Sequence, residues 1–148
     1  MSLPPVRKER TVQVPPSTAF AVFTDRIGEW WPLATHSIGG DAAVTAVCEP
    51  REGGRVYERL DDGTEHDWGR VQAWEPPFRL VISWYVGRDP AHSTEIEVRF
   101  DPAGEGACRV SLEHRNWERL GDEAAATRDG YDTGWDTVLG GYTNLAGA

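Results

Sequence analysis

The residues DGYDTGWDTVLGGYTNL, numbers 129–145, carry a helical pattern around which the other elements of the chain are arranged. Glycines at positions 130, 134, 140 and 141 lie in or beside its apolar stripe, and each costs a helix interior about 0.5–1 kcal/mol relative to alanine. The large apolar residues recur with the period of an α-helix that has one apolar face: Tyr131, Trp135, Val138, Leu139, Tyr142 and Leu145. We therefore expect a long C-terminal helix, starting as early as Asp122. Because its glycines weaken it in isolation, we expect a curved sheet to grip its apolar face.

The rest of the chain supplies the strands of such a sheet. Runs of alternating or β-branched residues, bounded by proline, glycine and aspartate, predict strands at residues 6–14, 43–49, 55–60, 65–74, 78–86, 94–100 and 107–115. The last two alternate between apolar and polar residues, so one face of an antiparallel sheet is wet and the other is covered.

Two short helices, residues 18–23 and 26–31, are expected directly after the first strand, and Pro32 ends the second one. The order is then one strand, two short helices, six strands and a long helix. This order predicts an α+β fold in which a curved antiparallel sheet of about six or seven strands wraps around the C-terminal helix. A chain of 148 residues fits one domain, residues 1–148.

The composition is that of a folded, acidic protein. Hydrophobic residues make up 39% of the chain, seven residues are tryptophan, and the net charge is −9. An acidic surface repels phosphate groups, so we expect neither nucleic acid nor an anionic membrane as a partner. No signal peptide or membrane span is recognised, and Cys48 and Cys108 are expected to be reduced and buried. We expect a cytoplasmic protein.

Several motifs occur in a fixed order along the chain. They are VPPSTAF (14–20), WWP (30–32), GGRVYE (53–58), WGRV (68–71), WEPPFRL (74–80), LEH (112–114) and GW (134–135). With them the chain resembles the START-like, or SRPBCC, superfamily, and within it the family named after the activator of the heat-shock chaperone ATPase. The resemblance implies a helix-grip fold. The likeness to eukaryotic chaperone activators extends only to their C-terminal domain, since their N-terminal domain has no counterpart in this sequence.

Two polar residues on apolar strand faces are candidates for the cavity that such a fold leaves between sheet and helix. His114 can exchange a hydrogen bond with a ligand or act as acid or base near neutral pH. Glu58, if it points inward, needs a partner such as Arg70 or a histidine. The structural alternatives are a histidine that bonds backbone or water, and a glutamate in a surface ion pair. The two residues form an acid–base pair only if they face each other.

The tryptophans favour a flat aromatic or polycyclic ligand. We place Trp31, Trp68, Trp84 and Trp135 near the cavity, and His36 in a loop at its mouth. The alternatives are ordinary core filling for the tryptophans and a solvated loop position for the histidine. The sharpest prediction is that Trp135 faces the same interior as Trp84 and His114.

The sequence lacks the motifs that metal binding, nucleophilic catalysis and phosphate binding require. The sequence contains no C-x-x-C, H-x-x-x-H or H-E-x-x-H spacing for a metal and no G-x-S-x-G elbow for a nucleophile. Gly53-Gly54 is too short for a phosphate loop and does not lead into a helix. We therefore assign no metal, no cofactor and no catalytic residue from the sequence.

Three functions remain as hypotheses. The first is non-catalytic binding of a small apolar or aromatic ligand between the sheet and the C-terminal helix. The second is a protein-interaction regulator resembling the chaperone ATPase activators, which would have a protein partner and an exposed apolar or acidic patch. The third is an enzyme resembling polyketide cyclases or aromatases, in which His114 or Glu58 moves protons. The sequence favours the first, with a small hydrophobic or aromatic molecule as the partner.

Overall fold

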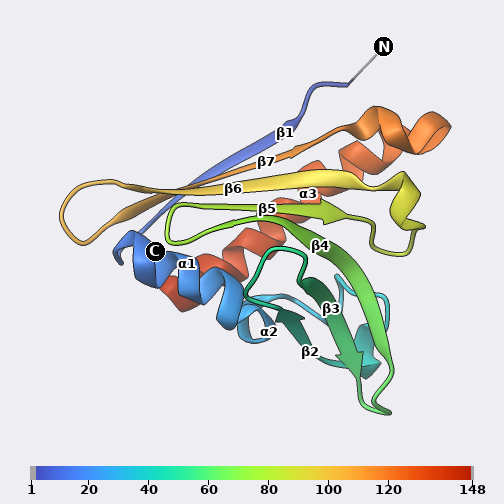
Figure 1. Ribbon diagram of the computed structural model, residues 1–148, viewed down its shortest axis with the longest axis horizontal. Helices are drawn as coiled ribbons and strands as arrows, with labels where there is room; N and C mark the ends of the chain where they lie inside the picture. The colour runs from blue at the N-terminus through green and yellow to red at the C-terminus, as the bar shows by residue number, and fades with distance from the viewer. Residues whose placement is uncertain (1–2, 148) are drawn as a thin grey trace.

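The structure, a computed structural model, describes residues 3–147 and contains an antiparallel sheet of seven strands (Figure 1). The strands lie in the order β1-β7-β6-β5-β4-β3-β2 across the sheet. This sheet confirms the strands predicted from the alternating patterns. Their bounds are β1 Val6–Val12, β2 Ala43–Cys48, β3 Arg55–Leu60, β4 Glu65–Glu75, β5 Arg79–Trp84, β6 Thr94–Pro102 and β7 Cys108–Arg115.

The sheet is curved at the end formed by β2 to β5. The pairing register shifts once between β2 and β3, once between β3 and β4, and once between β4 and β5. Such bulges bend a strand and increase its twist. Gly69 lies within β4, where an added Cβ would stand 2.0 Å from the carbonyl oxygen of Ser83 on β5. A glycine at this position lets the two strands approach closely.

Two short helices follow the first strand, as predicted. They are α1, Pro16–Asp25, and α2, Ile27–Trp30. The first is longer than expected because a proline is well accommodated in the first turn of a helix, and Pro16 occupies that place. The second ends at Trp30, since Trp31 precedes Pro32 and takes an extended conformation.

The long C-terminal helix α3 spans Ala124–Ala146 and lies across one face of the sheet (Figure 1). A 3₁₀ turn, Trp117–Glu123, precedes it, and Gly121 within this turn has a φ of 62°. This left-handed residue sets the start of the regular helix. On its outer side α3 is linked to β1, because Lys8 pairs with Asp132 at 3.0 Å and with Asp136 at 3.2 Å. The predicted grip of sheet on helix is confirmed.

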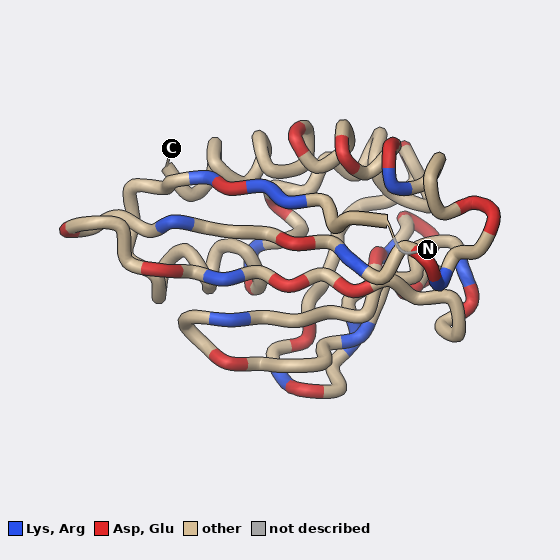
Figure 2. Tube along the Cα trace, turned by 90° about the horizontal axis from the view of Figure 1, so that it is seen from above, with Lys and Arg blue, Asp and Glu red and all other residues tan. Residues whose placement is uncertain are grey.

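The opposite face of the sheet is polar. Arg115 on β7 pairs with Glu97 at 2.7 Å and Glu113 at 3.0 Å, and also pairs with Glu95. Figure 2 shows basic and acidic residues interspersed along these strands rather than separated into two areas. No large area of one sign therefore covers this face of the sheet (Figure 2).

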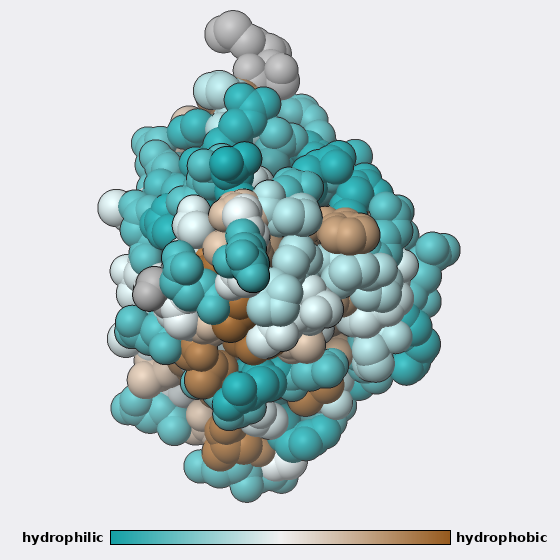
Figure 3. All heavy atoms as spheres, turned by 90° about the vertical axis from the view of Figure 1, so that its left-hand side faces the viewer, coloured by the Kyte–Doolittle hydropathy of each residue, from teal (hydrophilic) through white to brown (hydrophobic). Residues whose placement is uncertain are grey.

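Large apolar side chains are rarely exposed. The strand predicted from Phe78 is shorter than expected, because β5 begins at Arg79 and Phe78 lies in a turn with 53% exposure. The end of the molecule that carries the β6–β7 turn displays apolar residues only as small patches between hydrophilic ones (Figure 3). Cys48 and Cys108 are buried free thiols, as expected. No helix within residues 3–147 is long and apolar enough to cross a membrane.

Candidate functional site

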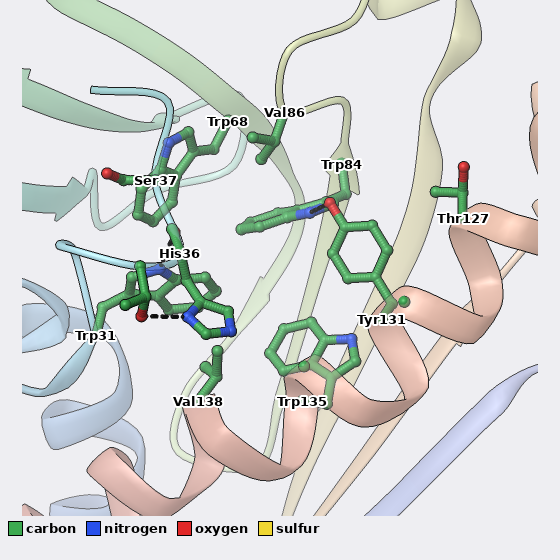
Figure 4. A pocket seen from close by; sticks show the side chains of 13 residues that line it. Trp31, His36, Ser37, Trp68, Trp84, Val86, Thr127, Tyr131, Trp135 and Val138 are labelled. Carbon is green, nitrogen blue, oxygen red and sulfur yellow. Dashed lines mark hydrogen bonds between the residues drawn. The ribbon is translucent and has the colours of Figure 1, made fainter. Parts of the chain in front are cut away.

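A pocket of about 310 Å³ lies between the curved sheet, the N-terminal part of α3 and the segment that follows α2 (Figure 4). We call it the aromatic pocket. A volume of this size lies at the lower end of the range of small-molecule sites. Its lining comprises Trp31, Thr35, His36 and Ser37 after α2, Trp68, Trp84 and Val86 from the sheet, and Thr127, Gly130, Tyr131, Gly134, Trp135 and Val138 from α3.

Indole rings form most of the pocket wall. The ring centroids of Trp31 and Trp68 are 4.9 Å apart, those of Trp31 and Trp84 are 5.8 Å apart, and those of Trp84 and Trp135 are 6.4 Å apart. All three pairs are tilted, so none of them is stacked face to face. Trp135 is 2% exposed and faces the same interior as Trp84, which confirms the predicted orientation of this helix.

Each of these indole N–H groups has an acceptor within the protein. The pairs are Trp31 Nε1 to the His36 carbonyl oxygen at 2.7 Å, Trp68 Nε1 to Glu58 Oε1 at 2.6 Å, Trp84 Nε1 to the Tyr131 hydroxyl at 3.0 Å, and Trp135 Nε1 to His114 Nδ1 at 3.0 Å. Buried indoles usually find such partners. The bonds fix the orientation of the four rings and leave their carbon surfaces for contact with a ligand.

His114 is fully buried and lies behind Trp135, not on the pocket surface. An indole N–H can only donate, so Nδ1 of His114 is the acceptor and Nε2 carries the hydrogen. Nε2 then donates to the Thr94 hydroxyl at 2.6 Å, and Thr94 donates to the carbonyl oxygen of Trp84 at 3.2 Å. Burial lowers the pKa of His114 to about 3, which keeps the ring neutral. Both ring nitrogens have hydrogen-bond partners within the protein. His114 therefore fixes the orientation of Trp135, whereas the sequence led us to expect that it would contact a ligand.

Glu58 is also fully buried, and it lies behind Trp68. Its carboxylate accepts hydrogen bonds from the backbone N–H groups of Ile38 at 2.7 Å and Gly39 at 2.8 Å, in addition to the indole of Trp68. These three donors take the place of the cation that the sequence led us to expect, while Arg70 donates to a backbone carbonyl elsewhere. Glu58 thus joins the loop after α2 to the sheet wall, and it is not hydrogen-bonded to His114.

His36 lines the pocket from that loop, as predicted. Its Nδ1 is 2.6 Å from the hydroxyl of Thr35, and its Nε2 is 3.8 Å from the position that a Cβ on Gly134 would occupy. Figure 4 shows the imidazole reaching from the loop toward α3. A Cβ at Gly134 would therefore make only an ordinary van der Waals contact with this ring.

The structure brings five of the seven residues proposed from the sequence to the pocket surface and places two behind it. Trp31, His36, Trp68, Trp84 and Trp135 line the pocket, whereas Glu58 and His114 support it from within. Tyr131 and Val138 were recognised on the helix stripe but not as lining residues. Val86 fell on the apolar face of the predicted strand 78–86, again not as a lining residue. Thr35, Ser37 and Thr127 carried no signal in the sequence, since loop and rim positions show no periodicity.

Tyr131, in the N-terminal part of α3, completes the wall of the pocket. Burial raises the pKa of its phenol, so the hydroxyl keeps its proton. No cluster of three or more histidine, cysteine or acidic side chains suited to a metal is found among residues 3–147. The pocket therefore offers aromatic surfaces together with a few polar groups.

Comparisons with known proteins agree with this architecture. The profile of the family described as "Activator of Hsp90 ATPase homolog 1-like protein" matches residues 13–145. The self-sacrificing resistance protein CalC from Micromonospora echinospora is 33% identical, with 98% of this chain and 97% of that one covered and a TM-score of 0.73. Txn09, an anthrahydroquino-γ-pyrone synthase, is 33% identical over 97% of both chains with a TM-score of 0.65.

A more distant likeness concerns the fold alone. The HSP90 activator PFC0360w from Plasmodium falciparum is 20% identical, with 77% of this chain and 74% of that one covered and a TM-score of 0.54. No curated protein matches the sequence. Since the family profile covers residues 13–145 and both relatives at 33% identity align over nearly the whole chain, this protein belongs to the activator of Hsp90 ATPase homolog 1-like family of the SRPBCC superfamily.

Proposed function

We propose that this protein binds a small, flat aromatic molecule in the aromatic pocket, and that binding itself is its function. The observation that carries the proposal is the arrangement of the four pocket indoles. Their N–H groups are all bonded within the protein, while their ring surfaces border a space of about 310 Å³. Aromatic contacts contribute about 0.5–1.5 kcal/mol per pair beyond the burial of area, so a planar ligand gains most from such walls.

The pocket is also held in place before any ligand arrives. Glu58 and His114 fix Trp68 and Trp135 from behind, and the Trp31 indole is fixed by its own loop. A site whose side chains are already ordered loses less entropy on binding. The name of the synthase relative supports an aromatic ligand, because an anthrahydroquino-γ-pyrone is a fused aromatic product.

Native mass spectrometry of the purified protein, followed by a titration that monitors tryptophan fluorescence, tests the proposal. We expect an aromatic compound to co-purify, or xanthone and flavone to quench the fluorescence at micromolar concentration. Replacing Trp31 by leucine removes one pocket wall and should weaken binding at least tenfold. The matched control is Trp74→Leu, because Trp74 packs on Phe20 and does not line the pocket. If no aromatic compound binds, or if both variants weaken binding equally, the proposal is wrong.

Catalysis on an aromatic ligand is a second candidate, favoured by the 33% identity to a protein described as a synthase. His36 is the candidate to carry a proton here, since it lines the pocket while Glu58 and His114 lie behind it. Incubation with an aromatic polyketide analogue, followed by mass spectrometry of the products, distinguishes turnover from binding. If the ligand is unchanged after prolonged incubation, catalysis is excluded for that ligand and binding remains as the function.

Activation of a chaperone ATPase is the third candidate, and the family match is its support. Within residues 3–147, the large apolar side chains that are exposed are Ile38, Val44 and Phe78. An ATPase assay with the chaperone of the same organism tests this function. Stimulation of that ATPase, with no change on Trp31→Leu, would favour a partner surface outside the pocket.

A further inference from the structure

The polar atoms of the aromatic pocket define what kind of aromatic molecule it can hold. The four indole N–H groups are used within the protein, and the Ser37 hydroxyl donates to the Leu33 carbonyl while accepting from the Gly40 N–H. Thr127 accepts a hydrogen bond from Arg88 at 3.2 Å. Two polar groups of its aromatic and imidazole side chains remain for a ligand, the hydroxyl hydrogen of Tyr131 and Nε2 of His36, while at the rim the hydroxyl hydrogen of Thr127 also has no acceptor within residues 3–147.

Tyr131 offers a hydrogen-bond donor. Its oxygen accepts from Trp84 Nε1 at 3.0 Å, and within residues 3–147 no acceptor is found for its own hydrogen. This partly buried hydroxyl can donate to an oxygen atom of a ligand. The Trp84 indole holds the phenol oxygen in place, so the donor is oriented in advance.

His36 offers a second polar group on the other side of the pocket. Thr35 engages Nδ1, whereas Nε2 has no hydrogen-bond partner within the described part of the chain. Figure 4 shows Tyr131 and His36 on opposite sides, with Trp84 and Trp135 between them. Nε2 donates or accepts according to the tautomer, and a hydroxyl group is the partner that satisfies both cases.

We infer that the ligand is a planar aromatic molecule with two oxygen functions, a carbonyl-type acceptor for the Tyr131 hydroxyl and a hydroxyl group for His36 Nε2. This inference rests on the proposed function and specifies its ligand class. Tyr131 and His36 thereby determine specificity, while the tryptophans supply contact area that any flat molecule can use. A simple hydrocarbon of the same shape gains only the contact area.

Three probes of nearly equal shape test the inference on the unmodified protein. Xanthene has neither oxygen function, xanthone adds the carbonyl, and 3-hydroxyxanthone adds a hydroxyl as well. A neutral hydrogen bond has a net value of about 1 kcal/mol, which corresponds to about fivefold in affinity. We expect each added group to tighten binding by about fivefold, as measured by calorimetry or fluorescence quenching.

Two variants assign each gain to its residue. Tyr131→Phe should abolish the preference for xanthone over xanthene and keep the preference for 3-hydroxyxanthone over xanthone. His36→Leu should do the reverse. Tyr131→Phe also leaves the Trp84 N–H without its acceptor and so lowers stability, but the probe series on the unmodified protein and on His36→Leu does not depend on that variant.

The outcomes separate this inference from the proposed function. Binding of all three probes with affinities within twofold of one another would overturn the inference and leave aromatic binding standing. Preferences that persist in both variants would also overturn it. Failure of all three probes to bind would overturn the proposed function, and this inference with it.

Discussion

The two halves of helix α3 present the same apolar stripe to two different surroundings. In the packed half, residues 139–146, Tyr142 is fully buried, donates to the Ala19 carbonyl at 2.8 Å, and contacts Phe23 and Trp30 at centroid distances of 5.3 and 5.2 Å. In the pocket half, residues 124–138, Tyr131 and Trp135 border the aromatic pocket. The helical pattern is one and the same, so the elements opposite the helix decide whether a stripe becomes core or binding site.

The difference lies in what the aromatic rings face. Rings contact one another around both halves, as Phe20 and Phe100 do at 5.1 Å and Trp31 and Trp68 do at 4.9 Å. Around the packed half, the rings of α1, α2 and β6 fill the space against the helix. Around the pocket half, the indoles donate hydrogen bonds to Glu58, Tyr131 and His114 and leave a common space in front of their rings.

The largest expected effect concerns the close approach of the packed half to α2. An added Cβ on Gly141 would lie 2.3 Å from the carbonyl oxygen of Trp30, which is backbone and cannot rotate away. We expect Gly141→Ala to lower the free energy of unfolding by about 3 kcal/mol in a urea titration, as for an overpacked core.

Gly140→Ala is the matched control, because a Cβ at that position meets nothing within 4 Å. The control should gain about 0.5–1 kcal/mol from helix propensity. Equal changes in the two variants would show that the packed half is not closely packed against α2.

The next effect concerns the carboxylate behind the pocket. In Glu58→Gln an amide N–H₂ would oppose one of the N–H donors of the loop or of Trp68. We expect a loss of about 2–3 kcal/mol in stability, as for hydrogen bonds to a charged group. Hydrogen exchange should become faster at the backbone amides of Ile38 and Gly39 and remain unchanged at those of α3. Unchanged exchange at the two loop amides would contradict the role given to Glu58.

The third effect is a dependence of the free energy of unfolding on pH, which we expect from the buried imidazole of His114. The pKa of His114 is about 3 in the folded protein and 6.5 in an unfolded chain. Below pH 6.5 the imidazole is therefore protonated in the unfolded chain but stays unprotonated in the folded protein. The folded state is therefore destabilised as the pH falls, by about 2 kcal/mol at pH 5 relative to pH 8. Urea titrations at the two pH values should show this slope, and His114→Gln should lack it. If the pH dependence of the free energy of unfolding persists in His114→Gln, other groups cause it.

The smallest effect concerns the glycine that faces His36. A Cβ on Gly134 would lie 3.8 Å from His36 Nε2, which is an ordinary contact. Gly134→Ala should raise the free energy of unfolding by about 0.5–1 kcal/mol and weaken binding of 3-hydroxyxanthone a few-fold. The opposite sign expected for Gly141→Ala distinguishes the glycine that faces the Trp30 carbonyl from the one that faces His36. A destabilised Gly134→Ala would remove that distinction.

Much of this fold could be predicted because periodicity carries it. The alternation in 94–100 and 107–115 and the helical spacing from Tyr131 to Leu145 each specify an element and its buried face. The placement of Trp135 opposite Trp84 followed from those faces. The order of short motifs then indicated the superfamily.

The details of the site could not be predicted for a physical reason. Glu58 and His114 were recognised as polar residues on apolar strand faces, with other orientations left open. Their partners come from a loop, another strand and α3, which no local pattern brings together. Thr35 and Ser37 lie in that same loop. The glycines of α3 also differ for reasons outside the helix, since only position 141 faces a backbone carbonyl at 2.3 Å.

A titration of the indole ¹⁵N–¹H signals with 3-hydroxyxanthone tests the central claim most directly, because all seven tryptophans report at once. We predict saturable shifts for Trp31, Trp68, Trp84 and Trp135, and little change for Trp30, Trp74 and Trp117, which lie outside the pocket lining. No saturable shift for any signal, or equal shifts in both groups, would contradict a ligand site between the sheet and the pocket half of α3.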